Sequence, residues 1–170
     1  HLFEAKLIEL SKKYPFGSCE HTDFVFTGIH VSQGSDMTIS LDQSQYVKEI
    51  EPIKLTPARR KQQEDLITEE ERQSLRAVIG SLLYAAVNTR PDLCSRLGQL
   101  QTRINNGQVT DLLEANRVLH EAKQYADTKI TFQPIPISET RFLSLSDASF
   151  ASNKNDSSHQ GLLIMPCQRQ

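Results

Sequence analysis

Asp147 is the residue whose type and position most directly suggest catalytic chemistry. It stands at the end of segment 141–146, where apolar and polar residues alternate as they do in a β-strand. The alternation puts Leu143, Leu145 and Asp147 on one face, so the carboxylate would lie at the rim of an apolar core. A carboxylate at a strand end can bind a divalent cation together with other carboxylates. The competing interpretation is a turn-forming Asp, which turn preferences favour for the residue taken alone.

A run of basic residues offers a second kind of chemistry. Lys54, Arg59, Arg60 and Lys61 lie in segment 54–67, which contains Pro57 and few apolar residues. Such a cluster can contact the phosphates of a nucleic acid. A short charge run is more often a solvated segment, and the residues alone leave both interpretations open.

The overall composition limits the partners of the chain. Its 170 residues include 19 Lys and Arg against 21 Asp and Glu, a formal net charge of −2. This balance gives no global attraction to nucleic acid, so any basic surface must be local. With 38% hydrophobic and 24% charged residues, the composition is typical of a globular protein. No run of 18 apolar residues occurs, which argues against a transmembrane helix, and no membrane is predicted as a partner.

Cysteine usage indicates a reducing compartment. Cys19, Cys94 and Cys167 are odd in number and widely spaced, which predicts free thiols in an intracellular protein of the cytoplasm or nucleus. The triplet Cys19-Glu20-His21 resembles the start of a metal site, but no second close pair of ligands follows it. Zinc is therefore not predicted.

The elements around these residues form three regions and a linker, and together they predict an α+β fold. Residues 1–53 begin with a helix of mixed charge, followed by strands over 24–31 and 37–41 and a short helix over 45–50. Gly28 inside the first strand predicts a bulge or close approach by another backbone, or else a simple packing position. Residues 54–67 are predicted to be a linker.

Residues 68–127 predict three helices that close into a small bundle. Thr68 and Glu71 form a capping box, and apolar residues then recur on one helix face. That face comprises Leu75, Val78, Ile79, Leu82, Leu83 and Ala86. Gly80 is expected to permit a close crossing by another helix. A second helix is predicted to begin at Pro91, and a third to be capped by Thr110.

Residues 128–170 are predicted to be β. A short strand over 130–132 precedes the strand over 141–146, and a further strand covers 161–165. We expect the last two to pair antiparallel, with Asp147 near the end of the first.

Five short segments, taken in order, resemble a known family. They are Phe26-Thr27-Gly28-Ile29, Ile39-Ser40-Leu41-Asp42-Gln43-Ser44-Gln45-Tyr46-Val47, Ile79-Gly80-Ser81-Leu82-Leu83-Tyr84, Thr89-Arg90-Pro91-Asp92 and Leu145-Ser146-Asp147-Ala148-Ser149-Phe150-Ala151. Their order and spacing are similar to those of the reverse transcriptase of copia-type retrotransposons. The resemblance extends from Phe3 to Met165, and IGSLLY followed by TRPD is its most specific part.

The resemblance implies a role for each region. Residues 1–53 would be the end of the polymerase palm, with Gly28 in a hairpin that grips the primer end. Residues 68–127 would be the thumb, which packs against an RNA/DNA template–primer duplex. Residues 128–170 would be the connection and the opening of ribonuclease H, with Asp147 as its first metal-binding carboxylate. Contacts with nucleic acid are then expected at Gly28, Lys54, Arg59, Arg60, Lys61, Arg90, Arg96 and Arg103.

The chain departs from the family at its catalytic centres. The polymerase holds catalytic Mg²⁺ on a Tyr-x-Asp-Asp hairpin, and no adjacent Asp pair occurs in this sequence. Ribonuclease H works through two Mg²⁺ ions, which need several carboxylates. Ser149-Phe150 stands where the family usually has Asp-Trp. We therefore expect neither polymerase activity nor tight Mg²⁺ binding from these residues alone.

Two hypotheses follow for the whole chain. The first is an internal fragment of a Pol polyprotein, whose remaining segments supply the catalytic carboxylates and act as its partner. The alternative is a catalytically dead relic that serves, if at all, as a small helical module for contacts with nucleic acid or protein.

Overall fold

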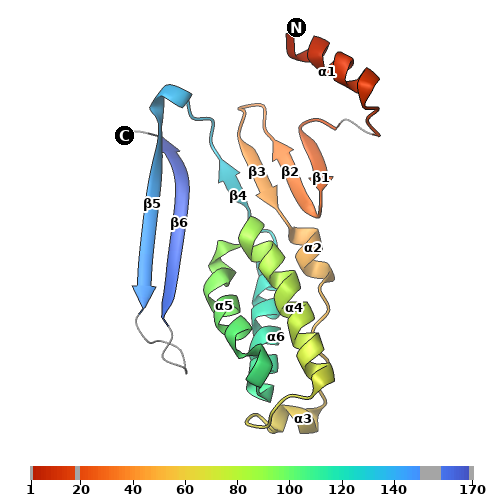
Figure 1. Ribbon diagram of the computed structural model, residues 1–170, viewed down its shortest axis with the longest axis vertical. Coiled ribbons are helices and arrows are strands. Elements are labelled where there is room, and N and C mark those ends of the chain that lie inside the picture. Colours follow the sequence, from red (N-terminus) through yellow and green to blue (C-terminus); the bar gives the residue numbers. More distant parts are fainter. Residues whose placement is uncertain (1, 18–19, 150–157, 169–170) are drawn as a thin grey trace.

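The computed structural model describes residues 2–17, 20–149 and 158–168, and within these it has a mixed α+β architecture, as predicted. Figure 1 shows a four-stranded sheet, a helical bundle and a long two-stranded hairpin beside the bundle. The first helix, α1 (Leu2–Lys13), buries none of its twelve residues. The sheet and the bundle are the parts that position the candidate site.

The four-stranded sheet is antiparallel, in the order β1-β2-β3-β4. Its strands are β1 (Asp23–Phe26), β2 (Ile29–Gln33), β3 (Ile39–Asp42) and β4 (Ile130–Phe132). The prediction of one strand over 24–31 is wrong, because Thr27 (φ 50°) and Gly28 (φ 79°) reverse the chain there. Two consecutive positive φ values between paired strands are typical of a two-residue type I′ turn. Gly28 is therefore a turn residue and not a bulge.

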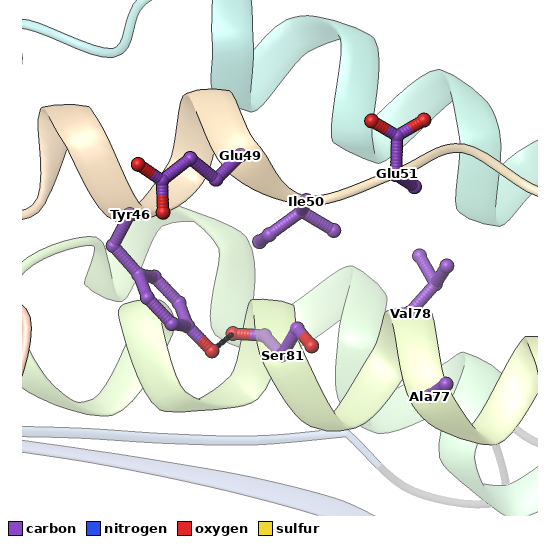
Figure 2. Close-up of a pocket in the computed structure, with 7 residues that line it drawn as sticks. All are labelled: Tyr46, Glu49, Ile50, Glu51, Ala77, Val78 and Ser81. Carbon is purple, nitrogen blue, oxygen red and sulfur yellow. Dashed lines mark hydrogen bonds between the residues drawn. The ribbon is translucent and has the colours of Figure 1, made fainter.

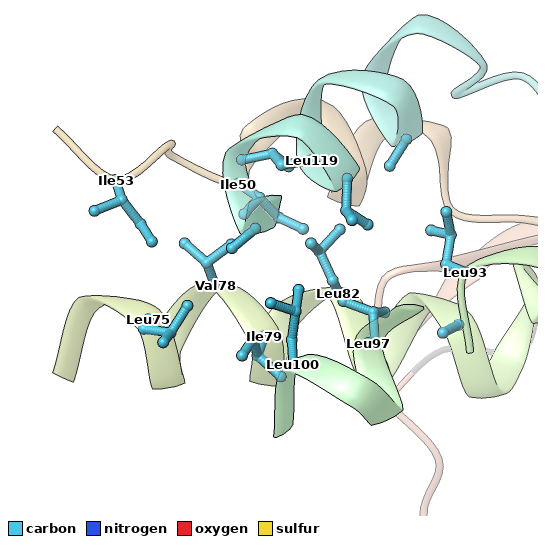
Figure 3. Packing of buried hydrophobic residues seen from close by; sticks show 14 of the residues in the cluster. Ile50, Ile53, Leu75, Val78, Ile79, Leu82, Leu93, Leu97, Leu100 and Leu119 are labelled. Carbon is cyan, nitrogen blue, oxygen red and sulfur yellow. The ribbon is translucent and has the colours of Figure 1, made fainter. Parts of the chain in front are cut away.

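The bundle contains the three predicted helices, α4 (Glu69–Asn88), α5 (Cys94–Arg103) and α6 (Val109–Gln124). Two 3₁₀ turns, η1 (Pro91–Leu93) and η2 (Ile104–Asn106), flank α5, and α2 (Ser44–Glu49) packs on α4 and α6. Their apolar faces share one buried core, part of which is drawn in Figure 3. The largest fully buried residues of this core include Leu75, Ile79, Leu82, Leu93, Leu97, Leu100, Leu112 and Leu119.

Capping interactions set where the helices begin. The Thr68 hydroxyl accepts from the Glu71 N–H and the Glu71 carboxylate accepts from the Thr68 N–H, which confirms the predicted capping box of α4. The predicted cap at Thr110 is wrong, because Gln108 and Asp111 form the capping pair of α6. The close crossing expected at Gly80 is also wrong, since a Cβ added there would meet open space.

Segment 54–67 is folded onto the bundle, although its composition predicted a linker. It contains α3 (Pro57–Lys61), which is capped by the Thr56 hydroxyl. The Ile67 N–H donates to the carbonyl of Gly107, and the Ile67 side chain is buried in the core. Local polarity along the sequence does not predict long-range contacts of this kind.

The C-terminal hairpin pairs β5 (Thr140–Ser149) with β6 (His159–Gln168), after the 3₁₀ turn η3 (Ile137–Glu139). The predicted antiparallel pairing is confirmed, with Asp147 opposite Gly161. Large apolar side chains remain exposed on both faces of the hairpin, namely Phe142, Leu162 and Ile164 on one and Leu143, Leu145 and Leu163 on the other. The apolar core expected beside Asp147 is thus not formed by the described residues.

Candidate nucleic-acid interface

The turn between β1 and β2 is fastened to helix α4 by a tyrosine. The Tyr84 hydroxyl donates to the carbonyl of Thr27 at 2.6 Å, and Oγ1 of Thr27 lies 3.1 Å from the same phenolic oxygen. Because Thr27 belongs to the first family-like segment and Tyr84 to the third, two segments far apart in sequence meet at this contact. We call the contact between the turn, Tyr46 and Tyr84 the tyrosine joint.

Tyr46 completes the joint from helix α2. A Cβ added at Gly28 would lie 3.4 Å from Cδ2 of Tyr46, so the turn rests directly on this ring. The rings of Tyr46 and Tyr84 meet edge to face, with centroids 5.3 Å apart. Figure 2 shows the Tyr46 hydroxyl reaching α4, where it donates to the carbonyl of Ser81 at 3.3 Å. The close approach predicted at Gly28 is therefore made by an aromatic side chain rather than by backbone.

A buried pair of polar side chains lies near the end of α4. The Thr89 hydroxyl donates to Oε1 of Gln43 at 3.0 Å, and both side chains are almost fully buried. Gln43 belongs to the second family-like segment and Thr89 to the fourth. These segments, like those of the tyrosine joint, are brought together by the fold.

Arg90 is removed from the candidate nucleic-acid contacts, because its side chain is 3% exposed. Its guanidinium donates to both oxygens of Asp92, at 2.9 and 2.8 Å, and to the carbonyls of Ala122 and Tyr125 at the end of α6. The hydrogen bonds from Arg90 lower the pKa of Asp92. Arg90 therefore satisfies the C-terminal carbonyls of α6, which also suits the negative end of the helix dipole.

Three further arginines from the predicted interface are held in internal ion pairs. Arg59 binds both carboxylate oxygens of Glu71 at 2.8 Å, and this lowers the pKa of Glu71. Arg96 pairs with Glu114 and Glu121 on α6. Arg103 donates to Asp111 at 3.2 Å. Each of these carboxylates competes with any incoming phosphate, so the three arginines are poor candidates for backbone contacts.

Lys54, Arg60 and Lys61 differ from these arginines in being exposed and having no ion-pair or side-chain hydrogen-bond partner in the described part of the chain. Arg60 and Lys61 lie on α3, which Figure 1 shows at the end of the bundle away from the sheet. We call these three residues the free cations. They are the charged members of the predicted set that remain available to phosphate.

Asp147 lies on the hairpin, across a cleft of about 720 Å³ from the start of α5. Pro91, Cys94 and Gly98 line the bundle side of this cleft, and burial raises the pKa of the Cys94 thiol. Among the described residues no group of three or more His, Cys, Asp or Glu side chains converges in a way that could hold a metal. A lone carboxylate does not fit a two-metal site. Phe150, Ala151 and Cys19 lie outside the described residues.

The sequence reasoning missed a cluster centred on His30, on the polar face of the sheet. Its Nδ1 lies 2.9 Å from Asp42 and its Nε2 lies 3.3 Å from Asp23. The hydrogen bonds with Asp42 and Asp23 raise the pKa of His30. The pKa of Asp42 is lowered, because hydrogen bonds from Ser44 and His30 outweigh its desolvation. Only the register of three strands brings these residues together, so no local pattern could have revealed the cluster.

No family model matches the chain, and neither a curated protein nor a solved structure shows significant similarity to it. Within residues 2–17, 20–149 and 158–168, no helix has the length and apolar character needed to cross a membrane.

Proposed function

We propose that this chain is the thumb-like part of a copia-type reverse transcriptase, and that it contacts the backbone of an RNA/DNA template–primer duplex. The observation that carries the proposal is the tyrosine joint. Four of the five segments that resemble the family occur in two contacts, Thr27 and Gly28 with Tyr46 and Tyr84, and Gln43 with Thr89. That residues of these segments meet in the fold supports the proposal that they serve one structural purpose.

The proposed duplex surface runs along α4 from the β1–β2 turn to the free cations. Tyr84, which holds the turn, and Glu71, which holds Arg59 of α3, are separated by 84 − 71 = 13 residues on α4. At a rise of about 1.5 Å per residue this is roughly 20 Å. With one base pair for about every 3.4 Å of duplex, a surface of this length covers about six base pairs.

The contacts expected at this surface are independent of base sequence. Lys54, Arg60 and Lys61 would meet phosphates, and phosphate contacts position a protein on a duplex without reading its bases. Because the chain carries a net charge of −2, we expect weak affinity, about micromolar or weaker at physiological salt. Catalytic aspartates would come from other segments of the Pol polyprotein.

The β5–β6 hairpin would then be the opening of a ribonuclease H domain, with Asp147 as one metal ligand among several. Its support is the position of Asp147 near the end of β5 and the apolar side chains on both faces. A strand pair of this composition is suited to burial between two layers. The described residues supply neither layer, so further segments of the polyprotein are the proposed cover.

Chemical-shift mapping tests the proposed surface. Titration of the ¹⁵N-labelled chain with a 12-base-pair RNA–DNA hybrid should shift the amides of Thr27, Gly28 and α3. The amides of β5 and β6 serve as an internal control and should not move. Shifts confined to the hairpin, or spread evenly over the chain, would contradict the proposal.

A protein-interaction module is the second candidate, and the exposed apolar residues of the β5–β6 hairpin favour it. Phe142 is 75% exposed and Leu162 is 64% exposed, which is unusual for residues so apolar. In that case the chain would bind no duplex at low salt, and the mapping experiment would show no shifts in α3 or at the turn.

A further inference from the structure

We infer that Tyr84 is a positioning residue, which holds the β1–β2 turn in one orientation over helix α4. The consequence of this positioning for duplex binding rests on the proposed function. Tyr84 is half-buried, and its hydroxyl is the group that reaches the turn.

Thr27 shows that the turn is held from outside. Thr27 is β-branched and adopts a φ of 50°, a left-handed conformation that such residues rarely occupy. Type I′ turns prefer Asn, Asp or Gly at this position. A disfavoured conformation persists where surrounding contacts over-determine it, and the Tyr84 hydroxyl contacts both the carbonyl and the side chain of Thr27.

Apolar packing does not provide an alternative anchor for the turn. Among the described residues, none in β1, β2, β3 or β4 belongs to the buried core, which lies entirely in the bundle and its flanking segments. The neighbouring Phe26 is 66% exposed. Hydrogen bonds from Ser44 to Asp42 and from Thr89 to Gln43 hold the far end of β3 on the helices, and the tyrosine joint is the contact that holds the turn itself.

Tyr46 acts as the support beneath the turn. Its ring lies against Gly28, its edge-to-face contact braces the Tyr84 ring, and its hydroxyl is fixed on Ser81. Gly28 has a φ of 79°, so a larger residue there would be strained as well as crowded against this ring. The two tyrosines thus fix the turn from two helices, Tyr46 from α2 and Tyr84 from α4.

A distance measurement between the sheet and the bundle tests the inference. Spin labels are attached to V25C on β1 and V87C on α4 in a background in which the three native cysteines are Ser. Both sites are well exposed, at 66% and 76%. In the chain that keeps Tyr84, pulsed electron paramagnetic resonance should give one narrow distribution of distances between the two labels. In Tyr84→Phe the distribution should become broad.

Tyr125→Phe is the matched control, because it removes the same hydroxyl from an exposed tyrosine at the end of α6. It should leave the distance distribution narrow. Far-UV circular dichroism should show unchanged helix content in both variants, since Tyr84→Phe retains the ring. An unchanged narrow distance in Tyr84→Phe overturns the inference, whatever happens to duplex binding.

The affinity of Tyr84→Phe for a duplex distinguishes the positioning role of Tyr84 from the proposed role of the turn in duplex binding. If the positioned turn is part of the duplex surface, Tyr84→Phe should weaken binding of a 12-base-pair hybrid by about fivefold, equivalent to one net hydrogen bond. If Tyr84→Phe broadens the distance distribution but leaves the affinity for the hybrid unchanged, Tyr84 positions the turn and the turn is not part of the duplex surface.

Discussion

The helical bundle and the β5–β6 hairpin use apolar residues in opposite ways. In the bundle, Leu82 and its neighbours are fully buried, and the charged groups Arg90 and Asp111 find partners at helix ends. In the hairpin, Leu162 and Phe142 lie exposed on a two-stranded ribbon. Within the described residues, the bundle therefore buries its apolar side chains, whereas the hairpin leaves several of its own exposed. The stability of the bundle should therefore depend on its apolar side chains far more than that of the hairpin does.

Truncation of a core leucine should give the largest difference between the two regions. Leu82→Ala should cost about 2–5 kcal/mol of unfolding free energy, because Leu82 is fully buried between helices. Leu162→Ala, the same change in the hairpin, should stay within about 0.5 kcal/mol. Urea denaturation followed at 222 nm measures both. A similar cost for the two variants would mean that the hairpin is already packed.

Loss of the buried guanidinium should be the next largest effect. Arg90→Ala removes four hydrogen bonds, two to Asp92 and one each to the carbonyls of Ala122 and Tyr125. We expect a loss of about 2–3 kcal/mol, and little rescue by Lys, which cannot form the same fork. Arg141→Ala in the exposed hairpin is the control and should be neutral. If Arg90→Ala leaves the free energy of unfolding unchanged, the structural role assigned to Arg90 is wrong and Arg90 is again a candidate for phosphate contact.

The His30 cluster should make the sheet sensitive to pH, with a smaller effect. The pKa of His30 is raised above 6.5, so its stabilisation is complete below that value and is lost as the pH rises through the folded-state pKa. The pKa of Asp42 is lowered, so the stabilisation from its carboxylate is lost only as the pH falls through a value below 3.8. Stability from the cluster should therefore be greatest between about pH 4 and 6.5.

Urea midpoints at pH 5.5 and pH 8 test this expectation. The free energy of unfolding should decrease from pH 5.5 to pH 8 by less than about 1 kcal/mol, because His30 and Asp23 are partly solvated. His30→Gln should abolish the difference between the two pH values. A stability that rises from pH 5.5 to 8 in the unmodified chain, but not in His30→Gln, would reverse the assigned sign.

Magnesium should have the smallest effect. Asp147 is exposed, and no group of metal-ligating side chains forms around it among the described residues. One carboxylate does not offset the dehydration of Mg²⁺. Addition of 10 mM Mg²⁺ should leave the melting temperature unchanged, and Asp147→Asn should behave like the unmodified chain. The purified chain should also incorporate no dNTP on a primed RNA template. Incorporation, or a stabilisation by Mg²⁺ that Asp147→Asn removes, would disprove the view that these residues hold no complete metal site.

Local patterns predicted much of the fold but little of the site. The capping box at Thr68, the apolar face of α4 and the pairing of β5 with β6 were all visible as short-range signals. The turn at Thr27 was missed because Thr is a poor type I′ residue, and its contact with Tyr84 is what compensates. The ion pairs of Arg59, Arg90, Arg96 and Arg103 were equally hidden, since charge alone does not reveal whether a guanidinium is already satisfied.

The salt dependence of duplex binding tests the central claim most directly, namely that the free cations contact the phosphate backbone. A triple variant, Lys54→Ala with Arg60→Ala and Lys61→Ala, is compared with a control that replaces Lys12, Lys13 and Lys129 by Ala. Both remove three exposed positive charges, so the net charge is matched.

Affinity for a 12-base-pair RNA–DNA hybrid is measured by fluorescence anisotropy between 25 and 200 mM salt, conditions chosen for weak nonspecific binding. The slope of log K against log salt should fall by about 2–3 in magnitude for the triple variant, since each phosphate contact contributes roughly 0.9, and should stay unchanged in the control. Binding that ignores salt, or equal slopes for the two variants, would contradict the proposal that these three cations hold the duplex.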